Sequence, residues 1–566
     1  MTYAYLHELK YPAAIPRNQL LLFNGTTPKT PFKKPTLRQM FLPYCKDYCQ
    51  IASVHGFRYL TDPKSQYFER IIWLLLLIGT TCGCLYVYSD LADLYSSQRV
   101  HTIVEDSLSP IFTKPFPAIG ICPRNRINWP KLMESHERFL SPNASEEAVQ
   151  TFQNFFSILN DFSFGQFFGL RWINDLHLNL SLLDDVEIKD VMQHVSFTCD
   201  ELFVQPCRWR QIAYNCCDLF SMERTEYGYC LVFNSLLTKE NQEKQRNDHF
   251  YPYHNSKTAE LTGLDIVVRL DESKVAPYRR SRNGVYVMVK QPEQWHGRTR
   301  LINPNTYTKL PIVAQFTSTD ERTRAVQPEE RRCLFEDETD HPLYKKIPDL
   351  EYRLSNCFTR CHQEYIFKYC KCNLRLVHPQ HESDNITSCT AKDFMCLYEH
   401  REFFKNDIHV SEREYIENVP NSTMICNCLS SCNQLIFVSN YISVPLDDFN
   451  ITDGMQYVHL DVHYTSSYMM RYSTQLRYSF VELLANFGGV IGLFLGASLI
   501  SGVELLYYFT IGLYIYLREK GFISNVFDSS YRSTAKVVSL NHRNLPRRRK
   551  RFLGNNKRTP GIHFKR

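Results

Sequence analysis

The chain has 566 residues, of which 14% are aromatic and 22% are charged, with 21 glycines and 27 prolines. This composition excludes collagen-like and low-complexity chains, and the aromatic content excludes a disordered one. The formal net charge of +6 is small for this length and gives no support to nucleic-acid binding. Two features do not fit a plain soluble protein: 20 cysteines and an uneven distribution of apolar residues.

The N-terminal region predicts a first membrane span. Residues 1–69 contain no secretory signal, because Lys, Arg, Pro and His interrupt their apolar runs. The stretch from Ile71 to Ser89 carries no charge and is bounded by Arg70 and Asp90. Since a bilayer core needs about 20 apolar residues in a helix, we expect a transmembrane helix over residues 70–89.

Residues 90–479 have the marks of an oxidising, extracellular compartment. Sixteen of the twenty cysteines fall in this range, an even number that favours disulfide bonds. Five Asn-x-Ser/Thr glycosylation signals fall there too, at Asn143, Asn179, Asn385, Asn421 and Asn450.

The first half of this region contains an amphipathic segment. Between Ser145 and Asp161, the residues Phe152, Phe155, Phe156 and Leu159 recur at helical spacing. We expect a helix that covers a sheet. Farther along, residues 336–341 form an acidic cluster, which we interpret as a solvated loop in preference to a cation or proton site.

The second half holds ten cysteines, and their spacing suggests a ladder. Cys357 and Cys361 share one face of a helical segment, and Cys426 and Cys428 share one face of an extended segment. A nested order would join a helix to a strand, although spacing alone does not determine connectivity. A zinc site at Cys370 and Cys372 beside His362 is the less favoured alternative. The nested pairs are Cys333–Cys432, Cys357–Cys428, Cys361–Cys426, Cys370–Cys396 and Cys372–Cys389.

Residues 480–517 predict a second span that is too long for one straight helix. Its 38 residues would extend about 57 Å at the usual rise, nearly twice the hydrocarbon thickness. Small residues occupy one helical face, which fits close helix packing. A local unwinding at Gly496, Ala497 and Ser498 would expose carbonyl oxygens that can replace a cation's hydration shell. The small face comprises Ala485, Gly488, Gly489, Gly492 and Gly496.

Polar residues follow this expected break. Ser501 and Glu504 lie in the apolar segment, and a carboxylate at membrane depth is a functional candidate. One pore residue per chain cannot enclose an ion, so this interpretation requires an oligomer.

Basic residues predict the orientation of the two spans. They are more frequent before the first span and after the second, where residues 547–551 form a basic run. We expect the N-terminal 1–69 and the C-terminal 518–566 to be cytoplasmic, with the basic run resting on anionic membrane lipid.

In combination, several motifs closely resemble the degenerin/epithelial sodium channel family, and most closely its insect pickpocket branch. The resemblance covers nearly the whole chain. The motifs are Val54–Tyr59, Phe116–Cys122, Gly228–Asn234, the ten-cysteine series, Leu484–Gly489 and Gly492–Ser498.

The resemblance implies roles for particular residues. Gly496, Ala497 and Ser498 match the selectivity-filter triplet, and Ala485 matches a position where bulky side chains hold such channels open. His55 and Gly56 match a cytoplasmic pair that supports gating. With these, we expect Asn486, Gly489, Ser501 and Glu504 to line or gate the pore.

The resemblance also implies an α+β membrane protein, a trimer with a β-rich, disulfide-stapled ectodomain, and the bridge Cys122–Cys230. Acid-sensing members have an aspartate where this chain has Asn486, so proton gating is not carried over. The pairing of Cys199, Cys207, Cys216 and Cys217 stays open.

We therefore expect a plasma-membrane subunit of a homo- or hetero-trimeric channel formed with related subunits. Sodium is the expected permeant ion, amiloride-type compounds are the expected blockers, and a chemical or mechanical stimulus acts on the ectodomain, in sensory cells. No cofactor, bound metal or nucleic acid is expected. The alternatives are an ATP-gated-type trimeric channel and a membrane-anchored receptor, adhesion protein or ectoenzyme. No nucleophile elbow, His-Glu-x-x-His or P-loop motif is present to support an enzyme.

Overall fold

The computed structural model describes residues 37–97, 99–379, 387–409, 423–446 and 454–519. It divides into two compact units. We call Met1–Ser89 together with Leu484–Arg566 the helical unit, and Asp90–Leu483 the β-rich unit. The expected glycosylation sites Asn385, Asn421 and Asn450 and the basic run at 547–551 lie outside the described residues.

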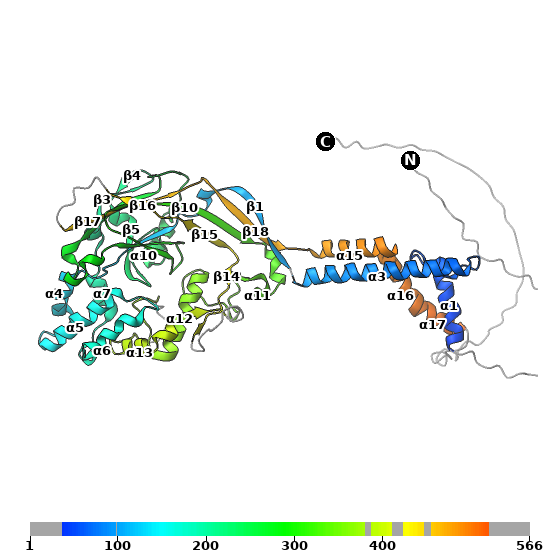
Figure 1. Ribbon diagram of the computed structural model, residues 1–566, viewed down its shortest axis with the longest axis horizontal. Coiled ribbons are helices and arrows are strands. Elements are labelled where there is room, and N and C mark those ends of the chain that lie inside the picture. Colours follow the sequence, from blue (N-terminus) through cyan, green and yellow to red (C-terminus); the bar gives the residue numbers. More distant parts are fainter. Residues whose placement is uncertain (1–36, 98, 380–386, 410–422, 447–453, 520–566) are drawn as a thin grey trace, which may run out of the picture. The chain divides into compact units, whose positions relative to one another are not determined.

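The helical unit is built from two apolar segments and an N-terminal helix. Two of its helical stretches, Tyr67–Ser97 and Leu499–Glu519, are long and apolar enough to cross a membrane, and Phe480–Leu495 is a shorter apolar helix. Figure 1 shows α15 running alongside α3. The elements are α1 (Leu37–Ile51), α2 (Phe57–Thr61), α3 (Tyr67–Ser97), α15 (Phe480–Leu495), α16 (Leu499–Tyr507), a π-helical turn (Tyr508–Gly512) and α17 (Leu513–Glu519).

Helix α3 is longer than the apolar run that predicts it. The predicted span covers 70–89, whereas α3 begins at Tyr67 and continues past Asp90 and Asp93 to Ser97. Helix propagation depends on backbone hydrogen bonds, so a helix can outlast the apolar side chains that place it in a membrane.

The β-rich unit contains a nine-stranded sheet. Its strands are β1 (Val100–Pro110), β3 (Phe203–Trp209), β4 (Ile212–Tyr214), β7 (Leu264–Asp271), β10 (Thr306–Thr319), β15 (Gln434–Ser439), β16 (Ile442–Pro445), β17 (Met455–Tyr464) and β18 (Tyr468–Leu476). The order is β1–β18–β10–β17–β7–β3–β4, and β15 and β16 also pair with β10.

A second, five-stranded sheet packs against this one. Its strands are β5 (Phe220–Thr225), β6 (Gly228–Phe233), β2 (Ala118–Pro123), β8 (Val285–Lys290) and β9 (Arg298–Ile302). Side chains from both sheets, such as Phe233 and Leu460, form one buried apolar core.

Helices gather in a separate group beside the sheets (Figure 1). They are α4 (Trp129–Phe139), α5 (Glu146–Ile158), α6 (Arg171–Asp175), α7 (Ile188–Val195), α12 (Leu354–Cys370) and α13 (Asp393–Glu399). Ser145 caps α5 by accepting a hydrogen bond from the Ala148 N–H at 3.2 Å.

The expected partner of the amphipathic segment is wrong. Phe152, Phe155 and Phe156 are fully buried in a second core made chiefly by helices, where Phe155 meets Phe394 of α13 at 5.5 Å between ring centroids. An apolar helical stripe requires burial but does not specify whether a sheet or another helix supplies it.

Eight disulfides cross-link the β-rich unit. The ten cysteines of its second half form the nested ladder, with Cys357–Cys428 and Cys361–Cys426 joining α12 to the segment around β13 (Met424–Ile425). The structure also resolves the cluster that the sequence left open, as Cys199–Cys217 and Cys207–Cys216. The remaining bridges are Cys122–Cys230, Cys333–Cys432, Cys370–Cys396 and Cys372–Cys389.

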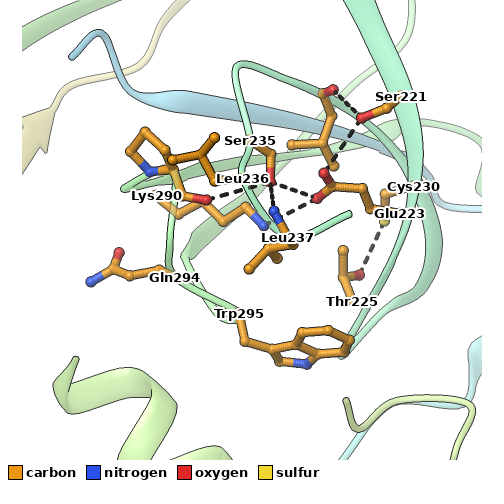
Figure 2. A network of polar contacts seen from close by, with 12 residues as sticks. Ser221, Glu223, Thr225, Cys230, Ser235, Leu236, Leu237, Lys290, Gln294 and Trp295 are labelled. Atoms are coloured by element: carbon orange, nitrogen blue, oxygen red, sulfur yellow. Dashed lines mark hydrogen bonds and ion pairs between the residues drawn. The ribbon is translucent and has the colours of Figure 1, made fainter. Parts of the chain in front are cut away.

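A buried ion pair lies at the five-stranded sheet. Lys290 Nζ is 3.6 Å from Glu223 Oε2, and both side chains are almost completely inaccessible to solvent. Ser235 donates a hydrogen bond to the same carboxylate at 2.9 Å, as Figure 2 shows. Burial raises the pKa of Glu223 and lowers the pKa of Lys290, and each charge opposes the effect on the other.

Candidate functional site

The second apolar segment is interrupted where Gly496, Ala497 and Ser498 stand. Helix α15 ends at Leu495 and α16 begins at Leu499. Gly496 has a φ of +61°, the left-handed region that favours glycine. Ser498 then caps α16: its hydroxyl accepts from the Ser501 N–H at 3.3 Å, and the Ser501 hydroxyl accepts from the Ser498 N–H at 3.1 Å.

This break leaves two backbone carbonyls unused. The Leu495 carbonyl accepts a hydrogen bond from the His55 N–H at 3.1 Å, and the Ser498 carbonyl accepts one from the Gly502 N–H at 3.2 Å. Among the residues that the structure describes, no group donates to the carbonyl of Gly496 or Ala497. Unpaired carbonyls in an apolar segment are costly unless water or a cation meets them. Such oxygens are the ligands that a partly dehydrated cation uses.

An N-terminal segment packs on the break. The imidazole of His55 lies so close to Gly496 that a Cβ at position 496 would collide with it. Gly56 has a φ of +90° and precedes α2. The structure thus brings together His55, Gly56 and the triplet, although Gly56 and Gly496 are 440 residues apart in sequence.

Ser53 belongs to this site, although no sequence motif singled it out. Its hydroxyl donates to the Ser501 hydroxyl at 2.8 Å. Ser501 is therefore buried and bonded to both Ser53 and Ser498. The only available signal was the position of Ser53 two residues before His55.

The small-residue face of α15 stays open within one chain. Ala485 and Asn486 are exposed, and a Cβ added at Gly488 or Gly489 would meet nothing within 4 Å. These residues lie about two to three helical turns before the break, and no described side chain of the helical unit covers them. A face of this kind fits a water-filled passage or the close approach of another helix.

Glu504 is half-buried on α16, two helical turns after Gly496. The second apolar segment therefore carries oxygen atoms at two positions along its length: the carbonyls of Gly496 and Ala497 at the break, and the Glu504 carboxylate after it. Oxygen ligands are those that hard cations such as Na⁺ prefer. The arrangement therefore has the type of oxygen ligand that a cation pathway requires.

The strands that adjoin the two apolar segments pair with each other. β1 follows α3 in the chain, and β18 precedes α15. They form an antiparallel pair that starts at Val100 opposite Leu476, and the hydroxyls of Thr102 and Thr474 are 2.8 Å apart. A change in this pair would reach both segments through the backbone.

The alternative sites in the β-rich unit do not have the required ligands. Cys370 and Cys372 are consumed by disulfides, and His362 instead pairs with Asp407 at 2.7 Å. The zinc alternative is therefore wrong at these positions. In the acidic cluster, Glu336, Asp337 and Glu338 pair with Arg353, Arg324 and Arg331, so their charges are already balanced.

Asn143 and Asn179, the two described glycosylation signals, are both exposed. Their side chains lie on the surface of the β-rich unit, Asn143 just before α5 and Asn179 at the start of a short helical turn (Leu180–Leu183). An attached glycan would meet no packing obstacle from its own residue.

Comparison with known proteins identifies the family of this chain. The model of the amiloride-sensitive sodium channel family matches residues 48–508, a range that holds the break, His55 and all eight disulfides. Pickpocket protein 19 of Drosophila melanogaster is 28% identical over 89% of this chain and 95% of that protein. Sodium channel protein Nach of Drosophila ananassae is 25% identical over 82% and 86%, respectively. Acid-sensing ion channel 4 of Mus musculus is 21% identical over 81% and 78%.

Proposed function

Because the chain belongs to the amiloride-sensitive sodium channel family, we propose that it is a pore-forming subunit of a sodium-permeable cation channel of the degenerin/epithelial sodium channel type. Members of this family are membrane-embedded ion channels and not enzymes. One observation carries the proposal further: the carbonyls of Gly496 and Ala497 accept no hydrogen bond from the described residues, at the break of an apolar segment.

The same geometry supports an oligomeric assembly. One chain supplies only one set of carbonyls, and the small-residue face of α15 has no partner within the described residues of its own chain. Three copies around an axis, or this chain with related subunits, would place these faces toward a common pathway. We propose a trimer in the plasma membrane that amiloride-type compounds block.

Two observations support the proposal that the stimulus acts on the β-rich unit. The unit is stapled by disulfides, which form in an oxidising compartment. Its β1–β18 pair continues directly into both apolar segments. We propose that this unit is extracellular, that both chain ends are cytoplasmic, and that a chemical or mechanical stimulus acts on it in sensory cells.

An electrophysiological experiment tests the channel. Ala485→Val should give a constitutive sodium current that amiloride blocks in voltage-clamped cells, because a bulkier side chain on the small-residue face prevents close packing. Leu483→Val, nearly opposite on the helix, is the matched control and should give no current. Absence of current with and without a related subunit would contradict the proposal.

A second experiment tests the filter. In the Ala485→Val background, Ser498→Leu removes the cap of α16 and adds bulk at the break. We expect a smaller current with a changed sodium-to-potassium permeability ratio. An unchanged ratio and amplitude would show that the pathway lies elsewhere.

An ATP-gated-type channel is the second candidate for the same topology, but no described feature favours it. Application of ATP to cells that express the chain separates the two candidates, because ATP should open only an ATP-gated channel.

The orientation of the β-rich unit is tested by glycosidase treatment. If this unit is extracellular, Asn143→Gln and Asn179→Gln should each remove one glycan and so one step in electrophoretic mobility.

A further inference from the structure

Helix α1 uses one face to contact the end of the second apolar segment. Phe41, Tyr44 and Tyr48 recur at positions i, i+3 and i+7, so their side chains share a face. Tyr44 and Tyr48 are only 5% and 3% exposed. Since most side chains of the helical unit are exposed, burial of these two tyrosines marks a specific contact.

The contact is made by aromatic rings. Tyr44 stacks on Tyr508 with the ring centroids 4.6 Å apart, and Tyr48 lies 4.9 Å from Tyr508 and 5.1 Å from Phe509. Tyr44 also meets Tyr516 of α17 at 4.8 Å. We call these five residues, Tyr44, Tyr48, Tyr508, Phe509 and Tyr516, the aromatic clasp.

A hydrogen bond reinforces the clasp at an irregular turn. Tyr508–Gly512 is a π-helical turn, in which backbone hydrogen bonds connect residues five apart. The Tyr44 hydroxyl donates to the Tyr508 carbonyl at 2.6 Å. The wider turn leaves room for this second donor, because a carbonyl has two lone pairs.

Gly512 allows the hydroxyl to approach. A Cβ at position 512 would lie 2.7 Å from the Tyr44 hydroxyl oxygen, closer than real Cβ atoms come. The Tyr44 hydroxyl therefore occupies space that is available only because residue 512 has no side chain.

We infer that Tyr44 is a positioning residue for the ion pathway, which fastens α1 to the segment beyond the break. The inference rests on the proposed channel function and extends it. The chain from α1 to Gly56 is attached on both sides of the break: His55 bonds to Leu495 before it, and Ser53 and Tyr44 bond to Ser501 and Tyr508 after it. Release of the clasp would leave the contacts of Ser53 and His55 as the described hydrogen bonds from this segment to the residues around the break.

Two native thiols report on the clasp without requiring a current. Cys45 and Cys49 are free, lie on α1 beside Tyr44 and Tyr48, and are half-buried. In the full-length protein, the maleimide labelling rate of these two cysteines, measured by mass spectrometry of their peptides, should rise about three- to tenfold in Tyr44→Phe, the effect of one lost hydrogen bond. Tyr514→Phe, an exposed tyrosine on α17, is the control and should not change the rate.

A double-mutant cycle tests the fit itself. Gly512→Ala should raise the labelling rate as Tyr44→Phe does, and the double variant should label no faster than either single variant, because both changes break the same contact.

A current measurement tests the role in the ion pathway. In the Ala485→Val background, Tyr44→Phe should reduce the sodium current at least threefold and leave the sodium-to-potassium permeability ratio unchanged.

The outcomes separate the inference from the proposed function. The inference would be overturned if Tyr44→Phe labelled at the same rate as the parent chain. It would also be overturned if the effects of Tyr44→Phe and Gly512→Ala on the labelling rate multiplied in the double variant. Increased labelling with unchanged current amplitude would also overturn it, because the clasp would then be structural only. If no variant conducts sodium but the labelling cycle is non-additive, the clasp stands and the proposed function fails.

Discussion

The two units of the molecule differ in how their apolar side chains are covered. The β-rich unit buries its large apolar residues in its own cores, joins sixteen cysteines in eight bridges and pairs the buried charges of Glu223 and Lys290. In the helical unit, Leu493 and Leu499 are 82% and 83% exposed in the single chain, and few described apolar side chains besides Tyr44 and Tyr48 are buried. Exposed apolar surface on this scale requires lipid or other subunits.

This difference predicts which property of the protein a substitution in each unit should change. The β-rich unit depends on internal contacts, so its substitutions should change stability. The break and its supporting segment depend on a few hydrogen bonds, so their substitutions should change conduction and leave the unfolding of the β-rich unit unaltered.

The largest expected effect is loss of the buried ion pair. Lys290→Met leaves the Glu223 carboxylate buried without its countercharge and should destabilise the β-rich unit by about 3–5 kcal/mol, measured by thermal unfolding of the full-length protein. Lys309→Met removes an exposed pair with Glu260 and should lower the unfolding temperature far less. Glu223→Leu combined with Lys290→Met should recover part of the loss. Equal unfolding of the two lysine variants would contradict the account.

Acid should weaken the β-rich unit through His378. Burial lowers the pKa of this histidine from its usual 6.5 to about 3, so the folded state holds it neutral. The unfolded chain binds a proton first, and stability is therefore complete above pH about 6.5 and falls as the pH decreases toward 3, by roughly 2–4 kcal/mol. Unfolding temperatures between pH 7.5 and pH 4 should fall less steeply in His378→Gln. Parallel curves for the two proteins would exclude His378 as the cause.

The next effect should appear in the helical unit alone. Gly496→Ala introduces a Cβ at a positive φ and against His55, with strain of about 1–3 kcal/mol. We expect it to abolish the current of the Ala485→Val channel while the unfolding temperature of the β-rich unit stays unchanged. His55→Gly in the same chain should restore part of the current, since it removes the collision. A lower unfolding temperature of the β-rich unit in Gly496→Ala would contradict the expectation that substitutions at the break leave this unit's stability unchanged.

The smallest expected effect concerns an ion network on the β-rich surface. Burial raises the pKa of Glu201, but hydrogen bonds from Lys131 and from the Thr198 N–H outweigh it and lower the pKa to about 2. The carboxylate stabilises the fold above pH about 4.5, and this contribution is lost as the pH falls toward 2. Glu201→Gln should cost about 1 kcal/mol at pH 7, because partial exposure screens the pair, and much less at pH 3. Glu240→Gln, on exposed α10 (Lys239–Asn247), should cost nothing measurable at either pH.

Local periodicity predicted the parts of the fold that depend on local geometry. Cys357 and Cys361 face one way on α12 because four residues make about one helical turn, and this made the nested ladder plausible. The break followed from an apolar segment that is too long for one helix. The pairing of Cys199, Cys207, Cys216 and Cys217 could not be predicted, because cysteines so close in sequence admit each pairing.

Contacts between distant residues carried no sequence signal. Ser53 and Ser501 are hydroxyls separated by 448 residues, and Tyr44 lies 464 residues from Tyr508. Glu223 and Lys290 resemble surface charges in sequence, since burial is set by the sheets that meet around them. The chemistry of these residues is visible in the chain, whereas their partners exist only in the fold.

The pairing of β1 with β18 has a mechanical consequence. The two ends that continue toward α3 and α15 are Val100 and Leu476, which stand opposite each other at the same end of the ribbon. A force that separates these ends acts on one hydrogen-bonded step at a time, as in opening a zip, and not on all steps together. The hydrogen bond from the Arg477 N–H to the Arg99 carbonyl, at 2.9 Å, would part first, followed by the Val100–Leu476 step. The Thr102–Thr474 hydroxyl bond lies two steps farther along the ribbon and would yield later. Beyond it, the register shifts around Asp106 interrupt the ladder and would bound how far such an opening runs.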